Sequence, residues 1–157
     1  MITINATMPA GQLQELKDGE VVNHDTTKLF ANKKVVMFAV PGAFTPTCSV
    51  AHLPGYVVSA DELKAKGVDA IICVSVNDAF VMAAWGKAQN AENLMMLADG
   101  DGSYTKALGL TMDTAAFGGV RSQRYSMIID NGVVTNLNIE KPKEFEVSNA
   151  ETIINQL

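Results

Sequence analysis

The sequence has few cysteines and arginines, and it has no long apolar segment. Cys48 and Cys73 are the two cysteines among 157 residues, too few for the disulfide framework of a small secreted protein, and this favours a reducing compartment. No stretch approaches the roughly 18 consecutive apolar residues of a membrane span, and MITINATMPAG at the start lacks the basic and apolar regions of a signal peptide. We therefore expect a cytoplasmic protein without a membrane partner.

Basic residues are also scarce, which bears on nucleic-acid binding. The net charge is −5, the isoelectric point is about 4.9, and the 12 Lys and Arg residues are scattered. Binding to the phosphate backbone depends on clustered Lys and Arg, so the composition argues against a nucleic-acid partner. Both arginines, Arg121 and Arg124, lie within one stretch, RSQR.

The rest of the composition is that of a soluble globular protein. With 48% apolar and 18% charged residues, the 157-residue chain has the usual size and balance of one domain. No repeat, low-complexity tract or linker divides the sequence. We therefore expect a single domain over residues 1–157.

Two apolar, partly β-branched runs indicate buried strands. KKVVMFAV covers residues 33–40 and ends at Pro41, and VDAIICVSV covers residues 68–76. The segment LPGYVVSADELKAKG at 53–67 lies between them and has a helical composition. This spacing is typical of a βαβ unit, whose crossover makes the two strands parallel.

The second half of the chain continues this alternation and then changes. We predict a helix over 79–89 capped by residues 77–78, a strand over 94–99 and a short helix over 104–108. The first of these helices carries an apolar stripe that faces the core, formed by Phe80, Val81, Met82 and Trp85.

A hairpin and a last helix complete the predicted fold. RYSMIID and VVTNLNI flank Asn131-Gly132, a strong signal for a two-residue hairpin turn. The tail over 149–157 is predicted to be a short helix with Ile153, Ile154 and Leu157 facing inward. The order of elements predicts an α/β protein of thioredoxin-like fold, with a mixed central sheet flanked by helices.

Cys48 is placed at a helix start by the residues that precede it. In PGAFTPTCS, Pro46 suits the first helical turn, because its fixed φ fits there and its missing N–H would have had no partner. Free backbone N–H groups and the positive end of the helix dipole favour the thiolate, the nucleophilic form of cysteine. The alternative is a buried structural cysteine, a common role for a free thiol.

These residues carry a family resemblance. The pattern P-x-x-x-T-x-x-C from Pro41 to Cys48, the later CVSVNDAFVMAAWGK and the strand RSQRYSMI resemble the peroxiredoxins of the plant type II and mammalian type V subfamily. The resemblance covers nearly the whole chain. It implies a thioredoxin-like fold and a thiol peroxidase that reduces hydrogen peroxide and alkyl hydroperoxides without metal or other cofactor.

The resemblance also implies roles for individual residues. Cys48 becomes the peroxidatic nucleophile, and Pro41 becomes its apolar shield. Thr45 orients the peroxide and bonds the thiolate, a role compatible with the alternative of helix capping. Arg124 supplies the guanidinium beside the thiolate, and Arg121 is the competing candidate.

Groups around the thiolate matter because a low thiol pKa alone does not accelerate the reaction. Lowering a cysteine pKa by about 3 units raises the thiolate fraction at neutral pH roughly 30-fold. With a Brønsted slope of about 0.4 to 0.5, its nucleophilicity falls about 15- to 30-fold. Acceleration must therefore come from groups that hold the peroxide and stabilise the departing oxygen. We expect Phe44, Phe117 and Thr47 to contribute to the substrate pocket.

Two readings of Cys73 remain open. Its apolar surroundings in AIICVSV favour a buried, inert thiol, whereas plant type II relatives resemble this chain in having a second cysteine there, which makes it a candidate resolving cysteine. The C-terminal resolving cysteine of the type V pattern is missing from KEFEVSNAETI. This departure favours an external reductant, either glutathione with glutaredoxin or thioredoxin.

The resemblance further implies a homodimer formed around the active-site helix. Phe80 and Trp85 are candidates for its apolar patch, although packing in the core is the simpler interpretation.

Other function classes find less support in the sequence. His52 lies four residues after Cys48 and shares its face of a helix, which would suit a Cys–His hydrolase or acyltransferase, but no third orienting group is evident. Ala51 stands where the dithiol motif C-x-x-C needs a cysteine. His24 lies in a polar segment, and two Cys and two His without ligand spacing give no zinc site. A non-catalytic redox sensor would share the chemistry of Cys48 but turn over slowly.

Overall fold

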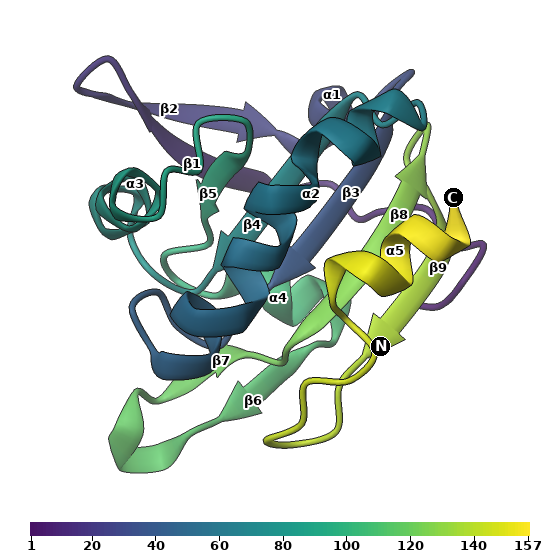
Figure 1. Ribbon diagram of the computed structural model, residues 1–157. Helices are drawn as coiled ribbons and strands as arrows, with labels where there is room; N and C mark the ends of the chain where they lie inside the picture. Colours follow the sequence, from purple (N-terminus) through teal and green to yellow (C-terminus); the bar gives the residue numbers. More distant parts are fainter.

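The computed structural model describes all 157 residues, and its centre is a seven-stranded mixed sheet (Figure 1). The strands of this sheet are β1 (Gln12–Lys17), β2 (Glu20–Asp25), β3 (Lys34–Ala39), β4 (Ala70–Ser75), β5 (Met95–Ala98), β8 (Tyr125–Asp130) and β9 (Val133–Ile139). Their order is β2-β1-β5-β4-β3-β8-β9. The pairs β3–β4 and β4–β5 are parallel and the other pairs are antiparallel. The predicted mixed sheet is confirmed.

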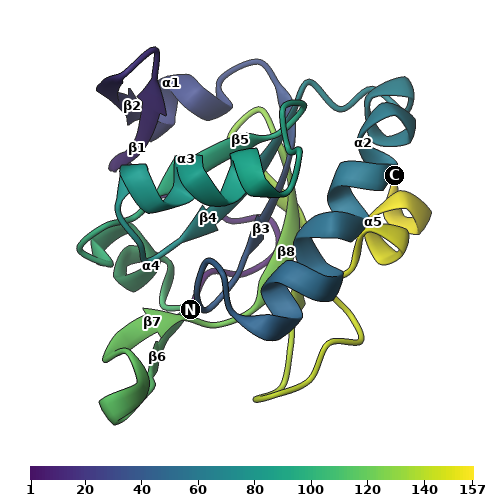
Figure 2. The same cartoon turned by 60° about the vertical axis from the view of Figure 1, so that its left-hand side comes forward.

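Five α-helices cover the sheet on both faces. They are α1 (Thr26–Phe30), α2 (Leu53–Ala65), α3 (Ala79–Ala88), α4 (Ser103–Leu108) and α5 (Ala150–Gln156). One hydrophobic core lies under α2, α3 and α5, which form one layer in Figure 2, and a second core lies under α1 and α4. None of these helices has both the length and the apolar character that crossing a membrane requires.

The central strands supply side chains to both cores. Along β3, Val36 and Phe38 belong to the core under α2, whereas Val35 and Met37 belong to the other core. Successive side chains of a strand point to opposite faces, so a strand covered on both sides must be apolar at every position. This explains the unbroken apolar run of β3 and of its parallel neighbour β4.

The helix α3 differs in one respect from the expected pattern. Asp78 caps it by accepting a hydrogen bond from the Val81 backbone N–H at 2.9 Å, and Met82 and Trp85 are fully buried, as predicted. Phe80, however, is 61% exposed, so its assignment to the core was wrong. Phe80 lies one residue after the buried Ala79 and two before the buried Met82, and at about 100° per residue these steps turn its ring away from the buried stripe.

Two hairpins were not predicted. β1 and β2 are joined at Asp18-Gly19, where both residues have positive φ, 52° and 80°, as a two-residue hairpin turn requires. The short strands β6 (Thr111–Asp113) and β7 (Val120–Ser122) form a separate two-stranded sheet. In Figure 1 this hairpin and the segment after β9 extend beyond the same end of the main sheet.

The C-terminal helix gives a direct test of the packing. Ile153 is fully buried, whereas Asn155 on the same helix is exposed. Replacing Ile153 with Ala should lower the free energy of unfolding by about 2 to 5 kcal/mol, because it removes buried methyl groups and leaves a cavity. Urea unfolding monitored by circular dichroism measures this. Asn155→Ala is the matched control, and an equal loss in both variants would contradict the assigned packing.

Candidate active site

Cys48 lies in the first turns of the helix that begins at Pro46. The Ser49 N–H donates to the Thr45 carbonyl oxygen at 3.0 Å, which closes the first turn. The segment Cys48–His52 is a π-helix, and the Leu53 N–H donates to the Cys48 carbonyl oxygen. The wider turn differs from the expected α-helix, so the spacing of four residues does not place Cys48 and His52 one above the other.

The Cys48 Sγ atom is fully buried and has two polar partners. The Thr45 hydroxyl lies 2.9 Å from it, and Nη2 of Arg124 donates to it at 3.1 Å. The Thr45 hydroxyl also lies 2.7 Å from the Gly42 carbonyl oxygen. It has a single proton, so it can donate to the carbonyl while accepting from a Cys48 thiol, or it can donate to a thiolate. The sulfur of Cys48 therefore has two polar partners, one of them charged, in otherwise apolar surroundings.

The structure separates the two arginines clearly. Arg124 precedes β8 and reaches the sulfur, whereas Arg121 on β7 donates to the carbonyl oxygens of Val76 and Gly118, both at 2.9 Å. Arg121 therefore ties the β6–β7 hairpin to the end of β4. Arg124 is the guanidinium that lies beside Cys48.

His52 contacts Arg124 and makes no hydrogen bond to Cys48. Nη1 of Arg124 lies 2.9 Å from Nδ1 of His52, and Nε2 of His52 lies 3.0 Å from the Ser148 carbonyl oxygen. A guanidinium only donates and a carbonyl only accepts, so the neutral ring carries its proton on Nε2. Burial and the charge of Arg124 lower the pKa of His52 to about 3. The ring therefore has no free nitrogen with which to act as a base toward Cys48.

Two further contacts hold the turn in front of Cys48. The Asn77 side-chain oxygen accepts from the Ala43 N–H at 3.0 Å, and the Nε1–H of Trp85 donates to the Ser49 hydroxyl at 3.0 Å. Phe44 adopts a left-handed φ of 66°, and its ring lies 6.4 Å from that of Trp85. Tertiary contacts thus maintain a backbone conformation that a phenylalanine rarely adopts.

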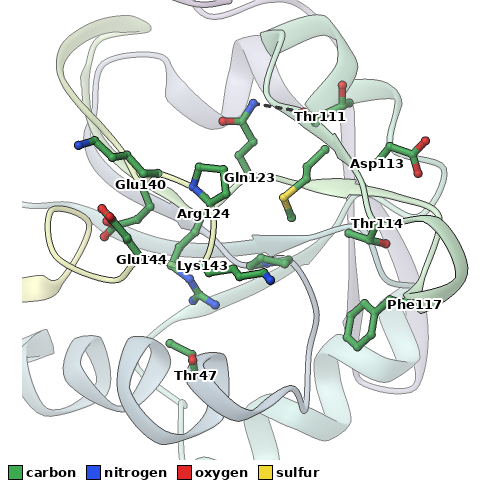
Figure 3. Close-up of a pocket in the computed structure, with 14 residues that line it drawn as sticks. Thr47, Thr111, Asp113, Thr114, Phe117, Gln123, Arg124, Glu140, Lys143 and Glu144 are labelled. Carbon is green, nitrogen blue, oxygen red and sulfur yellow. Dashed lines mark hydrogen bonds between the residues drawn. The ribbon is translucent and has the colours of Figure 1, made fainter.

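A cavity of about 700 Å³ lies next to the site (Figure 3); Cys48 is buried behind its lining, which includes the preceding residue Thr47 and the Arg124 side chain that donates to Sγ. Pro41, Thr47, Phe117 and Arg124 line it, together with residues of the β6–β7 hairpin and of the segment 140–144. Figure 3 shows the Arg124 guanidinium directed toward Thr47 at the base of the cavity. Phe44 does not line the cavity, in contrast to the expectation, because its backbone turns the ring toward α3.

Cys73 has a different environment from Cys48. It lies in the middle of β4, fully buried and paired in register with Phe38 and Met96 on the neighbouring strands. Burial raises the pKa of the Cys73 thiol well above its usual value, and the proximity of Cys48 adds to this effect. Cys73 is therefore held as an unreactive thiol in this conformation.

These features define a class of protein. A thiol lies at a helix start, with a hydroxyl and a fixed guanidinium as polar partners and a cavity lined by Thr47 and Arg124 beside it, on a thioredoxin-like sheet. No cluster of three His, Cys, Asp or Glu side chains is arranged to hold a metal ion. Such a site belongs to a thiol-dependent oxidoreductase.

Comparison with known proteins specifies the family. The Redoxin family model matches residues 3–154. Peroxiredoxin-2C of Oryza sativa subsp. japonica is 49% identical, over 99% of this chain and 98% of that protein, and Peroxiredoxin-2D of Arabidopsis thaliana is 46% identical over the same shares. The crystal structure of reduced Prx3 from Vibrio vulnificus in complex with H₂O₂ is 69% identical, covers 99% of both chains and has a TM-score of 0.98.

The chain belongs to the peroxiredoxins, in the group of the plant type II and type V proteins. It is a thiol-dependent peroxidase. The resemblance read from the sequence is thereby confirmed.

The state of His52 predicts a dependence of stability on pH. Its folded pKa of about 3 lies below the usual 6.5, so between these values the unfolded chain binds more protons and stability falls with decreasing pH. From pH 7 to pH 5 this residue should account for a loss of about 2 kcal/mol. Urea unfolding of the wild type and of His52→Gln at both pH values measures the difference. Equal losses in the two proteins would contradict a neutral, buried His52.

Proposed function

We propose that the Cys48 thiolate attacks the terminal oxygen of a hydroperoxide held in the cavity. A bond forms between Sγ and this oxygen while the O–O bond breaks, and the departing oxygen takes up a proton to leave as water or an alcohol. Cys48 becomes a sulfenic acid. Thr45 orients the peroxide, Arg124 stabilises charge on the sulfur and the departing oxygen, Pro41 shields the thiol from water, and Thr47 and Phe117 contact the substrate.

The observation that carries this proposal is the pair of donors on the sulfur. Thr45 and Arg124 lie 2.9 and 3.1 Å from Sγ, so they are already positioned where negative charge moves during the reaction. Donors fixed before the reaction need no reorganisation in the transition state, and a water-poor site strengthens them. Arginine suits this role because it stays charged and presents several donors in one plane.

Rapid-mixing kinetics with hydrogen peroxide tests these roles. Cys48→Ser should abolish the reaction, and Arg124→Ala should slow the peroxide step about 10²- to 10³-fold, the usual effect of losing one such donor. The later thiol step should change much less. Arg121→Ala is the matched control, since this guanidinium bonds only to backbone carbonyls. A peroxide step slowed equally by both arginine variants would refute the assignment of Arg124.

The proposed substrates are hydrogen peroxide and alkyl hydroperoxides. The cavity volume of about 700 Å³ far exceeds what hydrogen peroxide needs, and this supports the entry of organic hydroperoxides. Phe117 and Pro41 provide apolar surface beside polar side chains such as Thr47 and Gln123. For hydrogen peroxide itself, support comes from the Vibrio vulnificus relative, whose structure was solved in complex with it.

The proposed second half of the cycle uses an external thiol. Cys73 is fully buried within β4 and its pKa is raised, so resolution by Cys73 would require the centre of the sheet to open. An incoming thiol instead attacks the Cys48 sulfenic acid, releases water and forms a mixed disulfide, and a second thiol restores Cys48. The proposed reductant is glutathione with glutaredoxin, or thioredoxin.

Intact mass after one equivalent of hydrogen peroxide distinguishes the two cycles. We expect the gain of one oxygen, trapped by a sulfenic-acid reagent at Cys48, because Cys73 is inaccessible. Cys73→Ser should give the same result as the wild type. Loss of two hydrogens in the wild type, abolished by Cys73→Ser, would instead identify Cys73 as the resolving cysteine.

We further propose that the chain acts as a single domain in the cytoplasm and forms a homodimer. Exposed apolar side chains are Val50 on the Cys48 helix, Phe44 just before it, Phe80 on α3, and Phe117 and Val120 of the β6–β7 hairpin. Surface of this kind supports an interface between two copies. Trp85 takes no part in it because it is buried in the core.

A further inference from the structure

The Glu140 carboxylate collects an unusual number of hydrogen bonds for a residue outside the reacting centre. Glu140 follows β9 and is buried, and its oxygens accept from the backbone N–H groups of Glu146, Val147 and Ser148 at 2.8 to 3.0 Å. The Ser148 hydroxyl adds a further bond at 2.7 Å. These bonds outweigh the effect of burial and lower the pKa of Glu140. The carboxylate thus fixes the backbone of residues 146–148.

This backbone presents one carbonyl to the interior. The Ser148 carbonyl oxygen lies 3.0 Å from Nε2 of His52 and accepts from the Tyr56 hydroxyl at 2.7 Å. Ser148, His52 and Tyr56 are all fully buried, so water does not compete for these bonds. The N–H of Ser148 and its carbonyl therefore connect the Glu140 carboxylate to the His52 ring.

The connection ends at Arg124. Because the Ser148 carbonyl accepts from Nε2, the lone pair of His52 is on Nδ1, and it accepts from Nη1 of Arg124 at 2.9 Å. The Glu140 backbone N–H also donates to the Arg124 carbonyl oxygen at 2.9 Å. Glu140 therefore bonds to the Arg124 backbone directly, and it is connected to the Arg124 guanidinium through Ser148 and His52.

We infer that Glu140 is a positioning residue, whose carboxylate fixes the His52 tautomer through Ser148 and so holds the Arg124 guanidinium on Cys48. This inference rests on the role proposed for Arg124. Without the carboxylate, the Ser148 carbonyl is released, Nε2 loses its acceptor and the imidazole can exchange its proton between the two nitrogens. A ring protonated on Nδ1 faces Arg124 with donor against donor and displaces the guanidinium.

The alternative is that Glu140 only closes a surface loop. The two roles differ in what they do to His52 and to the chemical step, because a loop closure affects stability without fixing a tautomer. Glu140→Gln keeps the shape of the side chain but places an amide donor against backbone N–H groups. Glu146→Gln is the matched control, since Glu146 lies in the same loop, its side chain is exposed, and only its backbone bonds to the Glu140 carboxylate.

Two measurements test the inference on the full-length protein. Stopped-flow fluorescence follows the peroxide step through Trp85, which is the only tryptophan and bonds Ser49 beside Cys48. Nitrogen-15 NMR of histidine-labelled protein reports the tautomer of His52, and His24 is the only other histidine and serves as internal reference. Urea unfolding reports stability separately.

We expect Glu140→Gln to slow the peroxide step about 10- to 100-fold, the cost of a misplaced catalytic group, and to remove the single Nε2-protonated signature of His52. Glu146→Gln should match the wild type in both measurements. A folded Glu140→Gln with an unchanged His52 signature or a peroxide rate within twofold of the wild type would overturn the inference. The proposed function is tested separately: it fails if Cys48→Ser keeps the reaction or if Arg124→Ala leaves the peroxide step unchanged, whatever Glu140→Gln does.

A second variant decides the matter if Glu140→Gln does not fold. Ser148→Ala removes one donor to the Glu140 carboxylate and keeps the carbonyl that His52 contacts. It should slow the peroxide step more than Glu146→Gln and broaden the His52 signals. A Ser148→Ala protein with the kinetics and the His52 signals of Glu146→Gln would overturn the inference.

Discussion

The position of the Arg124 guanidinium is the constraint on which the rest of the site depends. One of its nitrogens donates to Cys48 and another to His52, over sequence separations of 76 and 72 residues. Arginine has donors and no acceptor, so every partner must offer a lone pair. This requirement makes His52 neutral and places its proton on Nε2, which then needs a hydrogen-bond acceptor. The Ser148 carbonyl oxygen, in the loop before α5, is that acceptor.

The two cysteines show why burial alone does not define reactivity. Both are fully buried and belong to the same hydrophobic core. Cys48 lies at the edge of this core, at the start of a helix and within reach of a hydroxyl and a guanidinium. Cys73 lies in a central strand with apolar residues on both neighbouring strands. The difference in chemistry follows from the donors around each sulfur rather than from exposure to solvent.

Most of the fold could be predicted because its signals are local. The apolar runs of β3 and β4, the Asn131-Gly132 turn and the Asp78 cap each depend on a few neighbouring residues, and the structure confirms them. The β1–β2 hairpin was missed although Asp18-Gly19 carries the same kind of turn signal as Asn131-Gly132. β6 and β7 span three residues each, too few for any periodicity to appear. Phe80 was wrongly assigned to the core because nothing in the local sequence distinguishes an exposed apolar residue from the buried apolar residues beside it.

The sequence by itself indicated Cys48 as the proposed nucleophile and determined its immediate setting, since Pro41, Thr45 and Cys48 lie within eight consecutive positions whose geometry one turn and one helix start define. It also directed attention to Arg124, through resemblance. Only the tertiary structure decided what holds that arginine. Ser148 bonds His52 across 96 residues and also bonds Glu140, and nothing in the local sequence marks Glu140 or Ser148. A hydrogen bond between distant segments depends on how the sheet and its loops bring them together, and that arrangement exists only in the folded chain.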